Sequence, residues 1–196
     1  MGFALSWIAV KGVPKEQVLA WMSLSDTGIT DDAMEAPLTG AQIPGWYVVV
    51  AKNQLDFARE EHLFNLSRGC EVIGCVVEEH EMRCEVVCYI DANFAWRADY
   101  FGENGPDETA LDSDGALPPE WAAIRDTQAG LQSSGDGSID YLFDAPLELA
   151  KAVCGFRHDL AKYDWGRIAF TELHGAAPTP PTPEKSGGWL KGLFGR

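Results

Sequence analysis

The sequence predicts an α+β domain built on a mixed, mainly antiparallel sheet with helices packed on it. Segments rich in Val, Ile, Cys and aromatic residues recur along the chain, and three of them follow one another directly. Other segments repeat apolar residues every three or four positions, as one face of a helix does. The predicted order over residues 1–174 is β-α-β-α-β-β-β-α-β-α-β, in a single globular domain.

The chain opens with a predicted central strand followed by a short helix. Residues 3–10 place apolar side chains on both faces, and residues 14–24 carry a helical stripe of Val18, Trp21 and Met22. We therefore expect the strand to be covered on both sides, with this helix forming part of the cover.

Residues 25–45 are rich in Gly, Pro and acidic residues, which predicts an extended loop. Trp46–Ala51 forms a second apolar run and predicts a buried strand. Asn53 is a suitable cap for a helix that runs to about Arg68 and ends at Gly69.

The stretch 69–102 has the densest β pattern and predicts three consecutive antiparallel strands. Two registers are open for the first pair. A register whose partner numbers sum to an even value groups Cys70 with Cys84 and Cys88, and puts Cys75 on the opposite face. The odd register would place Glu71 among apolar side chains, and burying an unpaired carboxylate is costly. We therefore expect the even register, with Trp96, Ala98 and Tyr100 continuing the face of Cys84.

The second half of the chain alternates acidic loops with short elements. Composition predicts a solvated loop over 102–116. The elements expected after it are a helix that opens at Pro118 and Pro119, a short strand at Ile139–Phe143, a helix capped by Asp144 and ended by Gly155, and a last strand at Arg167–Leu173.

Size and charge restrict the classes of function. The chain has 196 residues and a formal charge of -15, and this acidity argues against nucleic-acid binding, which needs Lys and Arg to neutralise phosphates. The N-terminal stretch lacks the pattern of a secretory signal, and no apolar run reaches the roughly 20 residues of a spanning helix. Five cysteines, an odd number on apolar strand positions, fit a reducing compartment. We expect a cytoplasmic protein.

The clustered cysteines are the first candidates for metal ligands, but their spacing does not fit a metal site. Cys70, Cys75, Cys84 and Cys88 contain no C-x-x-C pair of the kind structural zinc sites use. Residues four apart on a strand are separated by about 13 Å. The sequence predicts neither a metal nor a cofactor, and it lacks the common nucleophile and phosphate-binding motifs.

Two histidines have carboxylates nearby. His80 lies in an acidic hairpin turn, Glu78-Glu79-His80-Glu81, for which a solvated turn is the simpler interpretation. The stronger candidate is the sequence from Gly155 to Asp159.

Arg157, His158 and Asp159 follow the end of a predicted helix, where they can line a cleft with Asp140 or Asp144 as partners. The same residues can instead cap the helix, with a cation at its C-terminal end. The enzymatic hypothesis is a small hydrolase that uses His158 and Asp159, with Arg157 and Asp144 beside them.

The C-terminal part has a different composition. Residues 175–188 form a linker rich in Pro, Gly and Thr, and residues 189–196 form an amphipathic tip. The tip can fold back on the domain, contact a membrane surface weakly or bind a partner groove. Its candidate binding residues are Trp189, Leu190, Lys191, Leu193, Phe194 and Arg196.

The sequence favours a non-enzymatic binding protein over the hydrolase. Its acidic surface is expected to meet a basic protein partner, with the tip as a weak tether. In size, acidity and α+β composition the chain resembles immunity proteins that neutralise bacterial toxins. This resemblance includes no shared motif and assigns no residue.

Overall fold

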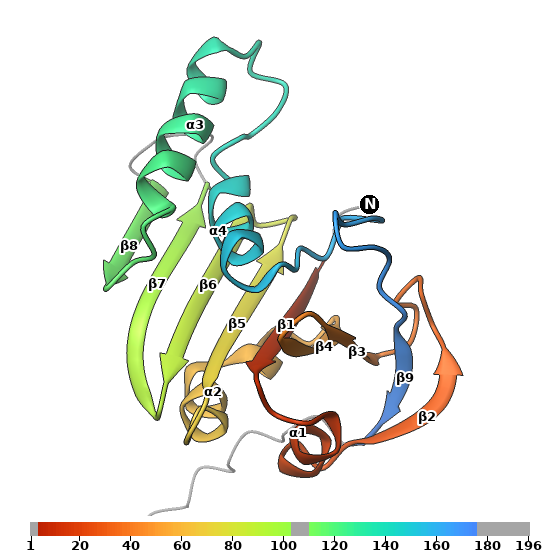
Figure 1. Cartoon of the computed structure of the whole chain (residues 1–196). Helices are drawn as coiled ribbons and strands as arrows, with labels where there is room; N and C mark the ends of the chain where they lie inside the picture. The colour runs from red at the N-terminus through yellow and green to blue at the C-terminus, as the bar shows by residue number, and fades with distance from the viewer. Residues whose placement is uncertain (1–3, 103–109, 176–196) are drawn as a thin grey trace, which may run out of the picture.

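A computed structural model of the chain describes residues 4–102 and 110–175. Within these residues one antiparallel sheet of nine strands organises the molecule, in the order β2-β9-β3-β4-β1-β5-β6-β7-β8 (Figure 1). The strands are β1 (Ala4–Lys11), β2 (Ser25–Thr30), β3 (Leu38–Ile43), β4 (Trp46–Lys52), β5 (Glu71–Glu78), β6 (Arg83–Ile90), β7 (Asn93–Phe101), β8 (Leu111–Gly115) and β9 (Thr171–His174). The helices are α1 (Lys15–Trp21), the 3-10 turn η1 (Leu55–Ala58), α2 (Glu60–Leu66), α3 (Trp121–Ser134) and α4 (Asp144–Cys154). The α+β class and the largely antiparallel sheet are as the sequence predicts.

Helices cover the sheet on both faces. One core packs α1, η1 and α2 against the sheet, and the other packs α4 and the start of α3 against the opposite face. Strand β1 lies between β4 and β5, with Trp7 in one core and Ile8 in the other. The prediction of a central strand with two buried faces is therefore confirmed.

Residues 25–45 are not an extended loop. They contain β2 and β3, and β2 forms an edge of the sheet through its pairing with β9 from the far end of the chain. Most of β2 is exposed, so it lacks the alternation of buried and exposed residues that marks a strand in a sequence. The loop prediction missed β2 because the pairing that creates this strand is long-range. It also missed β3, although β3 is mostly buried and forms a hairpin with β4.

The helix expected over 53–68 is divided into two elements. Asn53 has a positive φ of 57° and caps neither element, and Arg59 is extended with ψ 152° between η1 and α2. Phe57 on η1 and Leu63 on α2 are nevertheless both buried in one core. The apolar pattern identified Phe57, Ala58, Leu63 and Leu66 as buried, but Phe64 is 40% exposed, and the pattern did not predict the break.

Three further boundaries differ from the expectation. Strand β8 lies inside the predicted acidic loop, because its residues pair with β7 while remaining largely exposed. The segment 139–143 forms turns rather than a strand, and the last strand begins at Thr171 instead of Arg167.

The register of the β5–β6 pair is the odd one. Glu71 pairs with Ile90 and Cys75 with Val86, so Cys75 shares its face with Cys84 and not the opposite one. The odd register does not bury an unpaired carboxylate, because Glu71 lies at the start of the strand and forms an ion pair with Lys11 at 2.6 Å. Both faces of these strands are covered, so apolar alternation alone could not select the register.

The consecutive strands β5, β6 and β7 form a meander, and its third strand, β7, follows the prediction more closely. Trp96, Ala98 and Tyr100 continue the face of Cys84, and a bulge after Cys88 turns Phe94 to the other side. There Phe94 packs edge-on against Tyr89, with ring centroids 5.9 Å apart.

Helix α4 follows its predicted course between residues 144 and 154. Pro146 occupies its first turn, where a missing amide costs little, and Gly155 ends it with a φ of 79°. Asp144 is the first helical residue, with Phe143 in the cap position, so its predicted role as the N-cap was wrong. The reversal at Gly155 directs the following residues back along the helix.

Candidate functional site

A cavity of about 470 Å³ lies where the turn between β5 and β6 meets the start of α4 and the segment after it. Its lining brings together residues from three separate stretches of the chain. They are Glu79, His80 and Met82 from the turn, Asp140 and Phe143 before α4, Asp144 and Leu147 on α4, and Arg157, His158 and Asp159 after it. We call this feature the acidic cavity.

Packing of α4 on the sheet positions the segment that follows it. Leu147, Leu149 and Ala150 are buried against the strands. After Gly155, the ring of Phe156 packs edge-on against Trp7 with centroids 5.0 Å apart. This anchor holds the next three residues over the N-terminal half of the helix.

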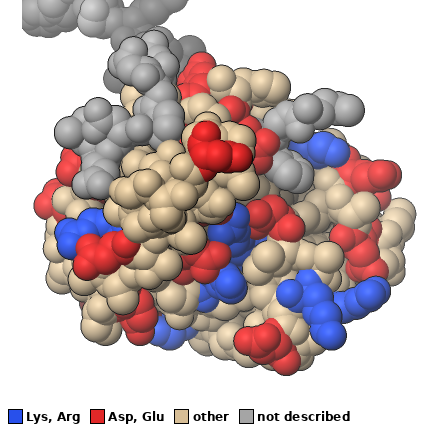
Figure 2. All heavy atoms as spheres, turned by 90° about the horizontal axis from the view of Figure 1, so that it is seen from above, with Lys and Arg blue, Asp and Glu red and all other residues tan. Residues whose placement is uncertain are grey.

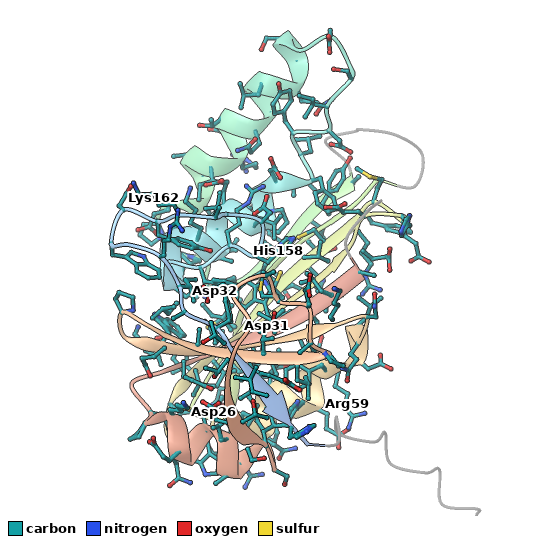
Figure 3. The ribbon with its side chains drawn as sticks, turned by 90° about the vertical axis from the view of Figure 1, so that its right-hand side faces the viewer. Asp26, Asp31, Asp32, Arg59, His158 and Lys162 are labelled. Atoms are coloured by element: carbon teal, nitrogen blue, oxygen red, sulfur yellow. The ribbon has the colours of Figure 1, made fainter. Side chains whose placement is uncertain are left out.

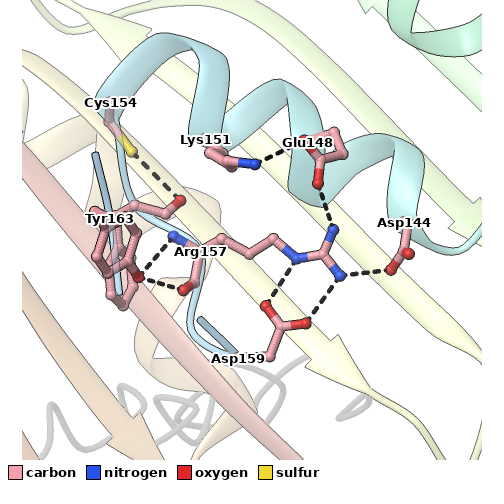
Figure 4. Close-up of polar contacts among 8 residues, drawn as sticks. Asp144, Glu148, Lys151, Cys154, Arg157, Asp159 and Tyr163 are labelled. Carbon is pink, nitrogen blue, oxygen red and sulfur yellow. Dashed lines mark hydrogen bonds and ion pairs between the residues drawn. The ribbon is translucent and has the colours of Figure 1, made fainter. Parts of the chain in front are cut away.

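Arg157 links three carboxylates into one network (Figure 4). Its Nε and Nη2 donate to Asp159 at 2.7 and 2.8 Å, Nη2 also donates to Asp144 at 2.7 Å, and Nη1 donates to Glu148 at 2.7 Å. The Arg157 side chain is only 10% exposed, and each of the carboxylates is about one-third exposed. A guanidinium with fixed donors suits such a bidentate contact better than an ammonium would.

The electrostatics of the network follow from burial and from the guanidinium. Burial raises the pKa of Asp144, and the attraction of Arg157 offsets this only in part. For Asp159 burial acts in the same direction, but the hydrogen bonds and charge of Arg157 outweigh it and lower its pKa. Attraction to the same carboxylates raises the pKa of Arg157, although burial opposes this. The guanidinium and Asp159 are therefore both charged near neutral pH.

His158 lies well inside the molecule, whereas Lys162 lies at its periphery (Figure 3). The residue is 4% exposed. Burial lowers its pKa to about 4, with the charge of Arg157 acting in the same direction and that of Asp159 opposing both. The imidazole is therefore neutral near pH 7.

Asp140 closes one side of the cavity. Its Oδ2 accepts a hydrogen bond from the Tyr100 hydroxyl at 2.6 Å, and its Oδ1 accepts one from the Phe143 amide at 3.4 Å. Both of these donors are neutral groups.

The structure thus brings Arg157, His158, Asp159 and Asp144 together, as the cleft hypothesis expected. Asp159 belongs to the network of Arg157, because both of its oxygens accept hydrogen bonds from the guanidinium.

Sequence reasoning missed two features of this site. It treated His80 as part of a separate solvated turn, whereas His80 and Glu79 line the same cavity. It also overlooked Glu148, which lies one helical turn after Asp144, a spacing that places both carboxylates on one helix face.

The surface around the site is mixed in charge. Figure 2 shows acidic and basic side chains interspersed on the face seen from above, without one continuous acidic field.

The C-terminal tip was the other predicted binding site. Trp189, Leu190, Lys191, Leu193, Phe194 and Arg196, the predicted binding residues of the tip, lie outside the described residues. The role of the tip as a tether therefore stays a prediction. Within 4–102 and 110–175, no helix is long and apolar enough to cross a membrane. The same residues contain no group of three His, Cys, Asp or Glu side chains arranged to hold a metal ion.

Comparisons with protein-family models, with curated proteins and with solved structures found no match to this chain.

Proposed function

We propose that this chain is a non-enzymatic cytoplasmic protein that binds a basic protein partner, which it neutralises or adapts. The acidic cavity receives a positively charged side chain of that partner. The resemblance in size and acidity to immunity proteins supports this class of function.

One observation carries the proposal: among the described residues that line it, the acidic cavity holds four carboxylates and one guanidinium. They are Glu79, Asp140, Asp144 and Asp159 against Arg157. In a concave site of lowered dielectric constant, this excess of negative charge attracts a cation more strongly than an exposed surface does. Phe143 and Met82 add apolar surface for the aliphatic stem of an arginine or lysine.

Two features of the cavity favour binding over the hydrolase that uses His158 and Asp159. Both carboxylate oxygens of Asp159 accept hydrogen bonds from Arg157, so the main partner of this group is the guanidinium. The lowered pKa of about 4 makes His158 a weak base, whereas a general base is most effective when its pKa lies near the working pH.

The test is a calorimetric titration of the full chain with an oligoarginine peptide, which measures the binding affinity. A peptide of equal length with citrulline in place of arginine serves as the neutral control. We expect binding only of the arginine peptide, and we expect it to weaken as salt is added. Glu79→Gln should weaken it roughly two- to fivefold, the effect of an ion pair worth about 0.5–1 kcal/mol.

The matched control is Glu61→Gln, which removes the same charge from an exposed position on α2. This helix packs on the opposite face of the sheet from α4. The proposal fails if Glu61→Gln and Glu79→Gln weaken binding equally, because the cavity would then contribute no more than overall charge. It also fails if the citrulline peptide binds as well as the arginine peptide.

A further inference from the structure

A second concave surface, separate from the acidic cavity, lies between α3 and α4. This groove has a volume of about 490 Å³. Ala123, Ile124 and Ala152 supply its apolar lining. Glu148 in this groove is already ion-paired with Lys151 and with Arg157, so Glu120 is the carboxylate that a basic ligand can meet. The groove therefore suits a ligand with apolar side chains and at least one positive charge.

Helix α3 is poorly covered for its length. It has 14 residues, of which only Trp121 is buried, and Leu131 is 41% exposed. Helices of about this length are marginal in water without tertiary packing. An occupant of the α3–α4 groove would supply the packing that α3 lacks.

We infer that the occupant is the C-terminal segment of this same chain, Trp189–Arg196. Its sequence, WLKGLFGR, combines four large apolar side chains with Lys191 and Arg196. Residues 178–196 contain three basic and one acidic residue, so they carry a charge of +2, which leaves -17 on the rest of the chain. Charge and apolar character thus both match the groove.

The length of the intervening chain permits this contact. The described part ends at Gly175, beside Ser23 and Leu24. The 13 residues from 176 to 188 span up to about 45 Å when extended. A sphere with the roughly 16 Å radius of gyration of a domain of this size is about 41 Å across, so the linker reaches the groove when it is nearly extended. The contact is then intramolecular, at an effective concentration set by the length of the linker.

The other occupants are less favourable electrostatically. A second copy would bring two chains of charge -15 together, and an anionic membrane would repel the same acidic body. The linked segment meets neither penalty.

Amine-reactive cross-linking of the full chain tests the inference, because each end of the contact carries a lysine. Lys151 lines the groove and its side chain is 42% exposed. The reference is Lys15, which ion-pairs with Asp26 opposite Leu173, close to where the linker begins. We expect Lys191 to cross-link to Lys151 within one molecule in preference to Lys15.

Two variants and one matched control complete the experiment. The double variant Trp189→Ser with Phe194→Ser should lose the Lys151–Lys191 link. Ala123→Arg should lose it too, because it fills an exposed position of the groove with a bulky cation that does not react. Ala122→Arg makes the same change at the neighbouring exposed position, outside the groove lining, and should keep the link.

Three results would overturn the inference. The first is equal linking of Lys191 to Lys15 and Lys151. The second is a link found only between differently isotope-labelled molecules, which would make the occupant a second copy. The third is flotation of the full chain with phosphatidylserine vesicles in the absence of the internal link.

Discussion

At the scale of single residues, Arg157 and His158 are neighbours with opposite electrostatic roles. Arg157 stays charged because three carboxylates surround it, and its side chain joins α4 to the segment that follows. The Tyr163 hydroxyl donates a hydrogen bond to the Arg157 carbonyl and so fixes the backbone at this point. His158 stays neutral because burial disfavours its charged form.

Burial of His158 predicts a dependence of stability on pH. Its pKa is about 4 in the folded chain against 6.5 for an ordinary histidine. Below pH 6.5 the unfolded chain therefore binds a proton that the folded chain does not. The free energy of unfolding should consequently fall as the pH drops from 6.5 towards 4, by roughly 3 kcal/mol from this group.

The measurement is urea unfolding of the full chain at several pH values. His158→Gln should flatten this part of the profile, whatever its effect at pH 7. Parallel profiles for the parent and His158→Gln would show that His158 does not cause the dependence.

At the scale of elements, α2 and β5 approach each other closely. Gly74 on β5 faces Leu63 on α2, and a Cβ atom at position 74 would lie 2.6 and 2.7 Å from the two Leu63 methyl carbons. Leu63 is fully buried, so it has little freedom to move. The missing side chain of Gly74 thus sets how closely this helix packs on the sheet.

We expect Gly74→Ala to lower the free energy of unfolding by about 1–3 kcal/mol through overpacking. In the double variant with Leu63→Ala, the new methyl group fills part of the cavity, so the loss should be smaller than the sum of the single losses. Urea unfolding of the four proteins measures this coupling. Gly130→Ala is the matched control: nothing lies within 4 Å of its added Cβ, and on α3 it should stabilise by up to about 1 kcal/mol.

Additive losses in this cycle would contradict the close contact. A neutral Gly74→Ala would do the same, because it would require α2 to pack further from the sheet.

At the scale of the whole molecule, the sheet has a protected centre and two exposed edges. β1 lies fifth among the nine strands, and β2 and β8 terminate the sheet. Most residues of β1 are buried, whereas those of β2 and β8 are partly or fully exposed. The centre therefore opens only when both cores separate.

This arrangement predicts a gradient of amide hydrogen exchange. Amides of β1 should exchange slowest, near the rate set by global unfolding, and those of β2 and β8 should exchange fastest among the strands. Exchange followed by nuclear magnetic resonance measures each strand in the same sample. Equal protection of β2 and β1 would mean that another chain pairs with the β2 edge.

Local patterns in the sequence determined the elements that are buried through their own residues. The run Trp46–Ala51, the three strands of the meander and the helix between Asp144 and Gly155 all have local markers. Alternating apolar residues, Pro146 in a first turn and a left-handed Gly155 do not depend on distant partners. These markers were sufficient for the fold class.

The tertiary structure alone decided the features that arise from distant pairing. Lys11 meets Glu71 across two strands and makes the odd register acceptable, and β9 turns an exposed polar segment into β2. The acidic cavity forms because the turn with His80 and the segment with His158 meet at one end of the sheet. The sequence shows which side chains each strand contains, but contacts between residues far apart depend on which strands pair across the whole sheet.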